Sequence, residues 1–95
     1  MRIDSGSSSG GQLSNTNEKV LSIVFHARST NGASVYVGDD GVGPGGGYEL
    51  TPDATVSPDF TQAGADPNAG HVLFSSFYVV CPTPNDKVDW LAILK

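Results

Sequence analysis

One stretch of the sequence, residues 34–60, restricts the chain to short β-strands joined by turns. Near its start is Val-Tyr-Val at positions 35–37, three strong strand formers, and a glycine and two aspartates then supply turn chemistry. At positions 48–51 Tyr and Leu alternate with Glu and Thr, the period-two pattern of a half-buried strand, until Pro52 removes a backbone donor. The stretch therefore predicts a strand, a reversal through a glycine-rich loop, and a second strand.

Composition supports a small all-β domain. Twelve glycines and six prolines among 95 residues argue against long helices, while a hydrophobic content of 38% is too high for a disordered chain. A domain of this length buries only about 60–65% of the surface that its unfolded chain exposes. We therefore expect modest stability in isolation, and oligomerisation or docking on a partner.

Charge and cysteine usage narrow the partners. Ten acidic residues against five basic ones give a net charge of -5, and no Lys/Arg cluster is present to contact phosphates, so nucleic acid is not an expected partner. The single cysteine, Cys81, excludes an internal disulfide and fits assembly in a reducing cytosol. No apolar run has the length of a membrane span, and the N-terminus lacks the apolar core of a signal peptide. We expect neither a membrane partner nor export.

The first 17 residues differ in composition from the rest of the chain. Residues 1–17 are rich in Ser, Gly and Asn, with Ile3 and Leu13 as apolar anchors, and such a segment cannot form a core by itself. We predict an extended, flexible N-terminal arm that docks on a partner, followed by a β-sandwich domain at 18–95. An arm that lies on its own domain is the alternative.

The clearest strand pattern is at residues 19–27. Leu21 and every second residue after it are assigned to the core, which leaves Val20 and Val24 on the opposite face as candidate protein-interaction residues. The Asn-Gly pair at 31–32 favours a turn, so we predict a hairpin between this strand and residues 35–37.

Three further strands are predicted towards the C-terminus. Residues 54–60 form a candidate edge strand, 61–70 an exposed loop and 72–81 a β-rich run that ends at prolines. Residues 86–94 alternate Val88, Trp90, Ala92 and Leu94 with a second set that includes Leu91 and Ile93, so both faces of this strand are apolar. It is either a central strand or covered by another chain; we favour cover by another chain and assign Trp90 to protein interaction. If Trp90 is instead a core residue, Leu91 and Ile93 are the partner-facing pair. The prediction is an antiparallel β-sandwich or barrel of about five to seven short strands.

Two motifs resemble catalytic or cofactor signatures without their structural context. Residues 6–10, Gly-Ser-Ser-Ser-Gly, match a nucleophile elbow, but no buried strand precedes them and no helix pattern follows. Gly41, Gly43 and Gly46 match a dinucleotide fingerprint, but the sequence after them cannot begin a helix. No catalytic or cofactor-binding residue is predicted.

Metal sites are likewise not predicted. Asp39 and Asp40 lack the alternating acids and the terminal Glu of a calcium loop. His26 and His71 have no Cys or His at ligand spacing. Exposed aromatic residues, Tyr36, Tyr48 and Trp90, are instead candidates for stacking on a glycan.

The segments VYVGDDGVGPGGGYELTPDATVSPDF and SSFYVVCPTPNDKVDWLAIL together resemble a module of small tailed-phage structural proteins. Its pattern is a VYVG strand, a gap, a G-Y-x-L-x-P step, a strand of the form I/F-Y-V-V-G and a closing K-V-x-W/V-L strand. The resemblance covers about residues 20–94 and rests on these positions: Val35, Tyr36, Val37, Gly38, Gly47, Tyr48, Leu50, Pro52, Tyr78, Val79, Val80, Lys87, Val88 and Trp90. Asp53 and Cys81-Pro82 stand where the module has glycine, so those turns are expected to be built differently here.

The resemblance implies a β-sandwich subunit of the virion, assembled in the host cytoplasm. A capsid decoration (cement) protein that binds the major capsid protein, as a homo-oligomer or symmetric array, is the first hypothesis. A neck, tail or fibre-base subunit is the alternative within the same class. A glycan-binding β-sandwich is a third hypothesis from another class, and an enzyme is the last.

Overall fold

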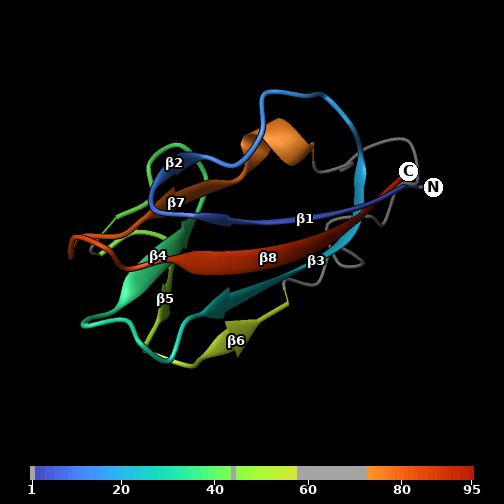
Figure 1. Ribbon diagram of the computed structural model, residues 1–95. Coiled ribbons are helices and arrows are strands. Elements are labelled where there is room, and N and C mark those ends of the chain that lie inside the picture. The colour runs from blue at the N-terminus through green and yellow to red at the C-terminus, as the bar shows by residue number, and fades with distance from the viewer. Residues whose placement is uncertain (1, 44, 58–72) are drawn as a thin grey trace.

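The computed structural model of this protein describes residues 2–43, 45–57 and 73–95. In this part of the chain two four-stranded antiparallel sheets pack face to face, so the predicted all-β sandwich is confirmed (Figure 1). The first sheet has the order β1-β8-β3-β6 and the second the order β2-β7-β4-β5. The strands are β1 (Arg2–Ser8), β2 (Gly11–Gln12), β3 (Val20–Ala27), β4 (Val35–Gly38), β5 (Tyr48–Leu50), β6 (Thr55–Val56), β7 (Tyr78–Val80) and β8 (Val88–Leu94).

The core lies between the two sheets and is built by alternation along each strand. β3 and β8 of the first sheet direct every second side chain inward, and β4, β5 and β7 of the second sheet supply the opposing layer. The Phe25 and Phe77 rings have centroids 5.6 Å apart. The buried hydrophobic residues are Val20, Ile23, Phe25, Ala27, Val35, Val37, Leu50, Phe74, Phe77, Val79, Val88, Ala92 and Leu94. Each larger one stabilises the fold by about 1.5–3 kcal/mol through its burial.

A β-bulge at the start of β3 corrects the predicted faces of that strand. The β3–β8 register shifts between Val20 and Ser22, so Val20 pairs with Leu94 and lies in the core. The extra residue, Leu21, is 45% exposed. The prediction that Val20 faces outward and Leu21 inward is therefore wrong, because a bulge changes the side-chain alternation where it is inserted.

The predicted hairpin between β3 and β4 is also wrong. β3 pairs with β8 and β6, whereas β4 pairs with β5 and β7, so the connection from 28 to 34 crosses from one sheet to the other. Buried polar groups hold this crossing. The Asn31 side chain donates to the Lys87 carbonyl and accepts from the Lys87 N–H, each at 2.9 Å. The buried Asp86 carboxylate accepts from the Gly32 and Ala33 N–H groups at 2.8 and 3.1 Å.

The reversal predicted around the glycine-rich loop is present as the antiparallel pair β4–β5. Gly47 ends the loop with φ +99, and a Cβ there would lie 2.4 Å from Val42 Cγ2 and 2.9 Å from the Val37 carbonyl oxygen. Only glycine fits this position, because both the backbone conformation and the space exclude a side chain.

Asp53 takes the left-handed conformation, φ 70, where the phage module has a glycine. Its N–H donates to the Ala27 carbonyl at 2.9 Å, which joins the turn to β3. Asp tolerates this conformation better than most residues. The turn that follows β5 is therefore built without a glycine at this position.

The N-terminal segment differs most from the prediction. β1 pairs with β8 along seven residues, and β2 pairs with β7, so residues 2–12 add an edge strand to each sheet. The sequence of this segment has no apolar alternation, and backbone pairing to a strong neighbour organises it instead. The structure thus has the alternative arrangement, an arm that lies on its own domain, and the described strands number eight.

The remaining predicted strands are shorter than expected. β6 occupies Thr55–Val56 at the edge beside β3, and both the last part of that predicted strand, 58–60, and the predicted loop at 61–70 lie outside the described residues. Within 72–81, a 3-10 helix at Phe74–Ser76 precedes β7. β8 lies between β1 and β3, so it is a central strand of the first sheet.

Candidate interaction surface

The outer face of the first sheet carries adjoining apolar side chains. Directly paired residues share a face of a sheet. Ile3 pairs with Ile93, and Val24 pairs with Leu91. Because Ala92 and Leu94 point into the core, Leu91 and Ile93 point out, and their partners point out with them. We call Ile3, Val24, Leu91 and Ile93 the β8 patch.

The β8 patch is accessible. Ile3 is 66% exposed and Leu91 is 45% exposed, while Val24 and Ile93 are half-buried. Single exposed apolar residues are normal on protein surfaces, but a contiguous group across three neighbouring strands is typical of a contact surface. β8 supplies the centre of the patch, β1 one side and β3 the other.

An ion pair borders the patch at one end. Beyond Leu91, Asp89 accepts from Arg28 Nε at 2.9 Å and from an Arg28 terminal nitrogen at 2.9 Å. In the other row of β1, which is paired with the inner residues of β8, Arg2 Nε donates to Glu18 Oε2 at 3.0 Å, and this hydrogen bond lowers the pKa of the Glu18 carboxyl. Such partly exposed pairs contribute little stability. The Arg28 pair does neutralise Asp89, the acidic side chain next to the patch, in a chain of net charge -5.

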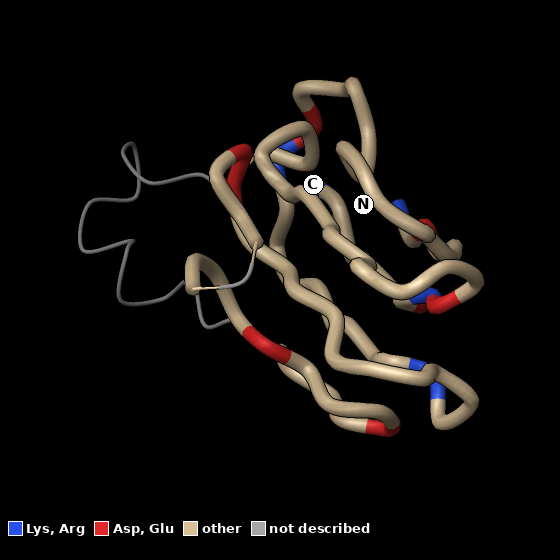
Figure 2. The backbone as a smooth tube through the Cα atoms, turned by 90° about the vertical axis from the view of Figure 1, so that its left-hand side faces the viewer, with Lys and Arg blue, Asp and Glu red and all other residues tan. Residues whose placement is uncertain are grey.

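Charge divides between the two sheets. All five cationic residues lie in or directly next to strands of the first sheet: Arg2, Lys19, Arg28, Lys87 and Lys95. The second sheet has Glu49 in β5 and Asp39-Asp40 directly after β4, with no Lys or Arg beside them. Figure 2 colours these positions along the backbone. The first sheet is therefore the less acidic and more apolar of the two outer surfaces.

The structure brings together two of the five predicted interaction residues. Ile3 and Val24 belong to the β8 patch. Trp90 instead points to the inner face, because neighbouring residues of a strand alternate and Leu91 points outward. The Trp90 ring packs edge-on against the Phe74 ring, with 5.2 Å between the ring centroids. Val20 is in the core, and Leu13 packs against the core beside β7. The assignment of Val20 to the outer face is therefore wrong, and Trp90 is not part of the β8 patch.

Sequence reasoning offers Leu91 and Ile93, the centre of the patch, only as the alternative for the case that Trp90 is a core residue. Both rows of residues in this strand are apolar and alternate with period two. The pattern therefore shows that Leu91 and Ile93 share a face, but it does not show which face of the strand packs against the other sheet. The signal that separates the two sets is residue type. Asp89 lies on the same face as Leu91 and Ile93, and a charged residue is rarely buried.

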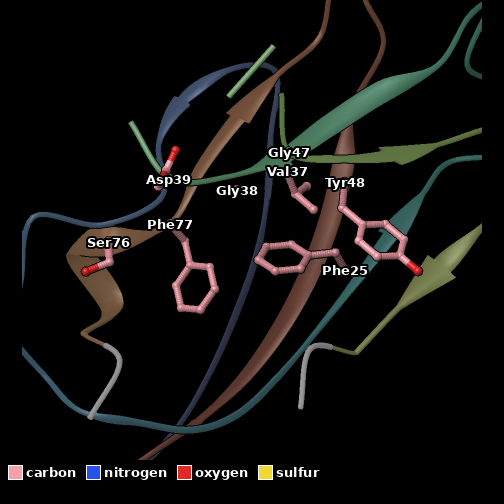
Figure 3. Close-up of a pocket in the computed structure, with 8 residues that line it drawn as sticks. All are labelled: Phe25, Val37, Gly38, Asp39, Gly47, Tyr48, Ser76 and Phe77. Carbon is pink, nitrogen blue, oxygen red and sulfur yellow. The ribbon is translucent and has the colours of Figure 1, made fainter. Parts of the chain in front are cut away.

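A pocket of about 480 Å³ opens at one edge of the sandwich (Figure 3). Its walls are the Phe25 and Phe77 rings, Val37 and the Tyr48 ring. In Figure 3 the polar ends of Asp39 and Tyr48 point away from the space between the two phenylalanine rings. The pocket interior thus suits an apolar group better than a polar one.

The three aromatic residues predicted to stack on a glycan do not share a surface. Tyr48 is 60% exposed at the rim of the pocket and lies on the inner face of β5. Tyr36 lies on the outer face of β4, and Trp90 packs in the other sheet. Tyr48 alone is available as a stacking surface at a pocket.

The described residues 2–43, 45–57 and 73–95 include an exposed pair, His26 Nε2 and Asp53 Oδ1, 3.0 Å apart. These residues hold no cluster of three or more His, Cys, Asp or Glu side chains that could bind a metal ion. Burial raises the pKa of the Cys81 thiol, and Asp86 raises it further, which favours the protonated, unreactive form. Residues 6–10 lie in and after β1, without the strand-to-helix turn of a nucleophile elbow. His71, considered above as a metal ligand, lies outside the described part of the chain. No helix within that part is long and apolar enough to cross a membrane.

Comparisons of the chain with known protein families, with curated proteins and with solved structures found no match.

Proposed function

We propose that this chain is a virion structural protein, a capsid decoration (cement) protein that attaches to the outer surface of a tailed-phage shell. The resemblance of residues 20–94 to a phage module supplies the class. The β8 patch is the observation that carries the docking role, because it is an exposed apolar surface on the less acidic side of an acidic domain. The partner is the major capsid protein.

The chemistry of the patch suits a static contact. Covering Ile3 and Leu91 removes apolar surface from water, and this gain does not depend on ionic strength. The Arg28 and Asp89 charges that border the patch are already paired within the domain, so docking leaves neither of them without a partner. A decoration protein with such a contact would stabilise a shell mechanically by adding buried area between neighbouring capsomers.

Copy number in purified particles tests this proposal. Quantitative mass spectrometry should find the chain in proportion to the major capsid protein. A small, fixed number of copies per particle, as in one ring of subunits, would favour the alternative, a neck, tail or fibre-base subunit. Absence of the chain from the particles would overturn both assignments.

A salt series tests the kind of contact. Attachment through apolar surface should change little between low and moderate salt, because screening acts mainly on exposed charge pairs. The free chain should not shift DNA in a gel, since its cations are scattered over one sheet and its net charge is -5. Detachment at moderate salt, or a shifted DNA band, would contradict docking on the capsid exterior.

A glycan-binding function is the second candidate, and the exposed Tyr48 ring beside the pocket favours it. Binding on a glycan array that is lost in Tyr48→Ala and kept in Tyr36→Ala would promote this candidate. Tyr36 is the matched control because it is half-buried on the opposite face of the same sheet. An array without signal would remove the candidate.

A further inference from the structure

β1 is a strand that contributes nothing to the core. None of its seven residues is buried, and the residues paired with the inner row of β8 are Arg2, Asp4, Gly6 and Ser8. These are polar residues and a glycine, so the inward side of β1 carries no apolar group. The strand can therefore leave the sheet without removing a core side chain.

Backbone pairing holds β1 in place. Its ladder with β8 runs from Arg2↔Leu94 to Ser8↔Val88 without a register shift. Two side-chain contacts add to the ladder. Arg2 donates to Glu18, and the Trp90 ring lies over Gly6, where a Cβ would come within 3.1 Å of it. None of these contacts requires that β1 and β8 belong to the same chain.

Two glycines lie at the step from β1 to β2 and form a hinge, with Ser9 before them and Gly11 as the first residue of β2. Gly10 has φ +141 and Gly11 has φ +98, and both are exposed. After them the chain is anchored again, because the Gln12 side chain donates to the Ser75 carbonyl at 2.8 Å and the Leu13 N–H donates to the Phe77 carbonyl at 2.9 Å. β1 is thus an extended segment of seven residues on a hinge whose base stays attached to the domain.

β8 requires a partner on this side. It is apolar on both faces, with Leu91 and Ile93 outside and Ala92 and Leu94 inside. Without β1, β8 would present an unpaired and hydrophobic edge, which readily pairs with another strand. A second β1 is the segment that fits this edge in register and with the same side-chain contacts.

We propose that β1 is an exchangeable strand, which pairs with β8 of a neighbouring copy of this chain when copies are held close together. The closed form described above is favoured in dilute solution, because a short tether gives its own strand an effective concentration in the range of about millimolar. A crowded array removes that advantage, and exchange then links copies through the same ladder at little cost. This inference holds whichever assembly the chain belongs to.

Cysteine pairing between separately purified chains tests the exchange. Ser5 and Leu91 are directly paired and point outward. Ser5→Cys and Leu91→Cys are each made with Cys81→Ser, mixed at high concentration and oxidised. The mixed disulfide dimer should exceed either homodimer several-fold, and its share should rise with concentration.

Val24→Cys in place of Leu91→Cys is the matched control. Val24 lies in the same row and on the same face, but one strand further from β1. General association through the β8 patch would join Ser5→Cys to either position, whereas exchange joins it to Leu91→Cys alone. Equal yields with the two partners would overturn the proposal.

A peptide provides a second measurement that does not depend on the folding of the Ser5→Cys chain. A synthetic peptide of residues 1–9 with Ser5→Cys should form a disulfide with the Leu91→Cys chain. The same peptide with Asp4→Pro should not, because proline removes a donor from the ladder and distorts it. Equal reaction of the two peptides would also overturn the proposal.

Discussion

The two sheets of this sandwich share one core but differ on their outer faces. The first sheet presents the β8 patch and all five Lys and Arg residues, each in or directly beside one of its strands. The second sheet presents Glu49 and Asp39-Asp40 with no cation. One side is thus suited to contact and the other to solvent. Such a difference gives a small domain a defined orientation on a larger surface.

The sheets also differ in how their edges are made. The first sheet has a long edge strand, β1, added by a Ser- and Gly-rich segment, while the second sheet has β2 with only two residues at the corresponding place. β1 and β2 are consecutive in the chain, and the glycine hinge lies at the step from one to the other. The N-terminal segment therefore closes both sheets with little apolar side-chain contact.

The connection between the sheets should give the largest loss of stability. Asp86→Ala removes the buried carboxylate that accepts from Gly32 and Ala33 at the crossing. We expect unfolding free energy to fall by about 3 kcal/mol, because two N–H groups lose a charged acceptor. Urea denaturation measures the change. Asp40→Ala, an exposed control, should have almost no effect, and equal losses in the two variants would contradict this role.

The β4–β5 loop of the second sheet should give the next largest loss. Gly47→Ala places a Cβ against Val42 and the Val37 carbonyl, and we expect a cost of about 2 kcal/mol from the clash and the positive φ together. Gly45→Ala separates the two causes, because Gly45 has φ +87 and open space around it. Thermal unfolding of both variants measures the difference. If Gly45→Ala is equally destabilising, the clash at Gly47 has no separate effect.

The β1 edge of the first sheet should respond to acid. Arg2 lowers the pKa of Glu18 below its ordinary value of 4.5, so the pairing favours the folded form above that pH and is lost as pH falls through the lowered pKa. Hydrogen exchange of β1 amides, corrected for the pH dependence of intrinsic exchange, should then show weaker protection, with β3 unchanged. In Glu18→Gln, the protection of the β1 amides should not change over the pH range in which Glu18 is protonated. An unchanged pH profile in Glu18→Gln would exclude the ion pair as the cause.

Much of the fold could be predicted from alternation. Phe25, Val37 and Val79 lie inside because β-branched and aromatic residues at every second position define one buried face. The β4–β5 reversal followed from glycine and aspartate turn chemistry. These features depend on short stretches of sequence, and local rules are sufficient for them.

The features that were missed depend on contacts between distant residues. The crossing after β3 is set by Asn31 and Asp86, which are far apart in sequence and bind each other's loops. β1 forms a strand because β8 offers it a ladder, which the composition of the segment does not indicate. The position of the β8 patch depends on which face of β8 meets the second sheet. Asp89 is the local signal that could identify the outward face of β8, because it lies in the same row as Leu91 and Ile93.

The most direct test of the account compares the two outer faces with matched valines. Val24 and Val80 are both half-buried and point outward, one on the first sheet in the β8 patch and one on the second sheet beside Tyr36. Val24→Ser and Val80→Ser should fold with similar stability, and each is mixed with particles stripped of the chain. Sedimentation then measures the bound fraction. We predict that Val24→Ser weakens binding several-fold while Val80→Ser binds like the natural chain. Equal binding by the two variants, or loss confined to Val80→Ser, would contradict docking through the first sheet.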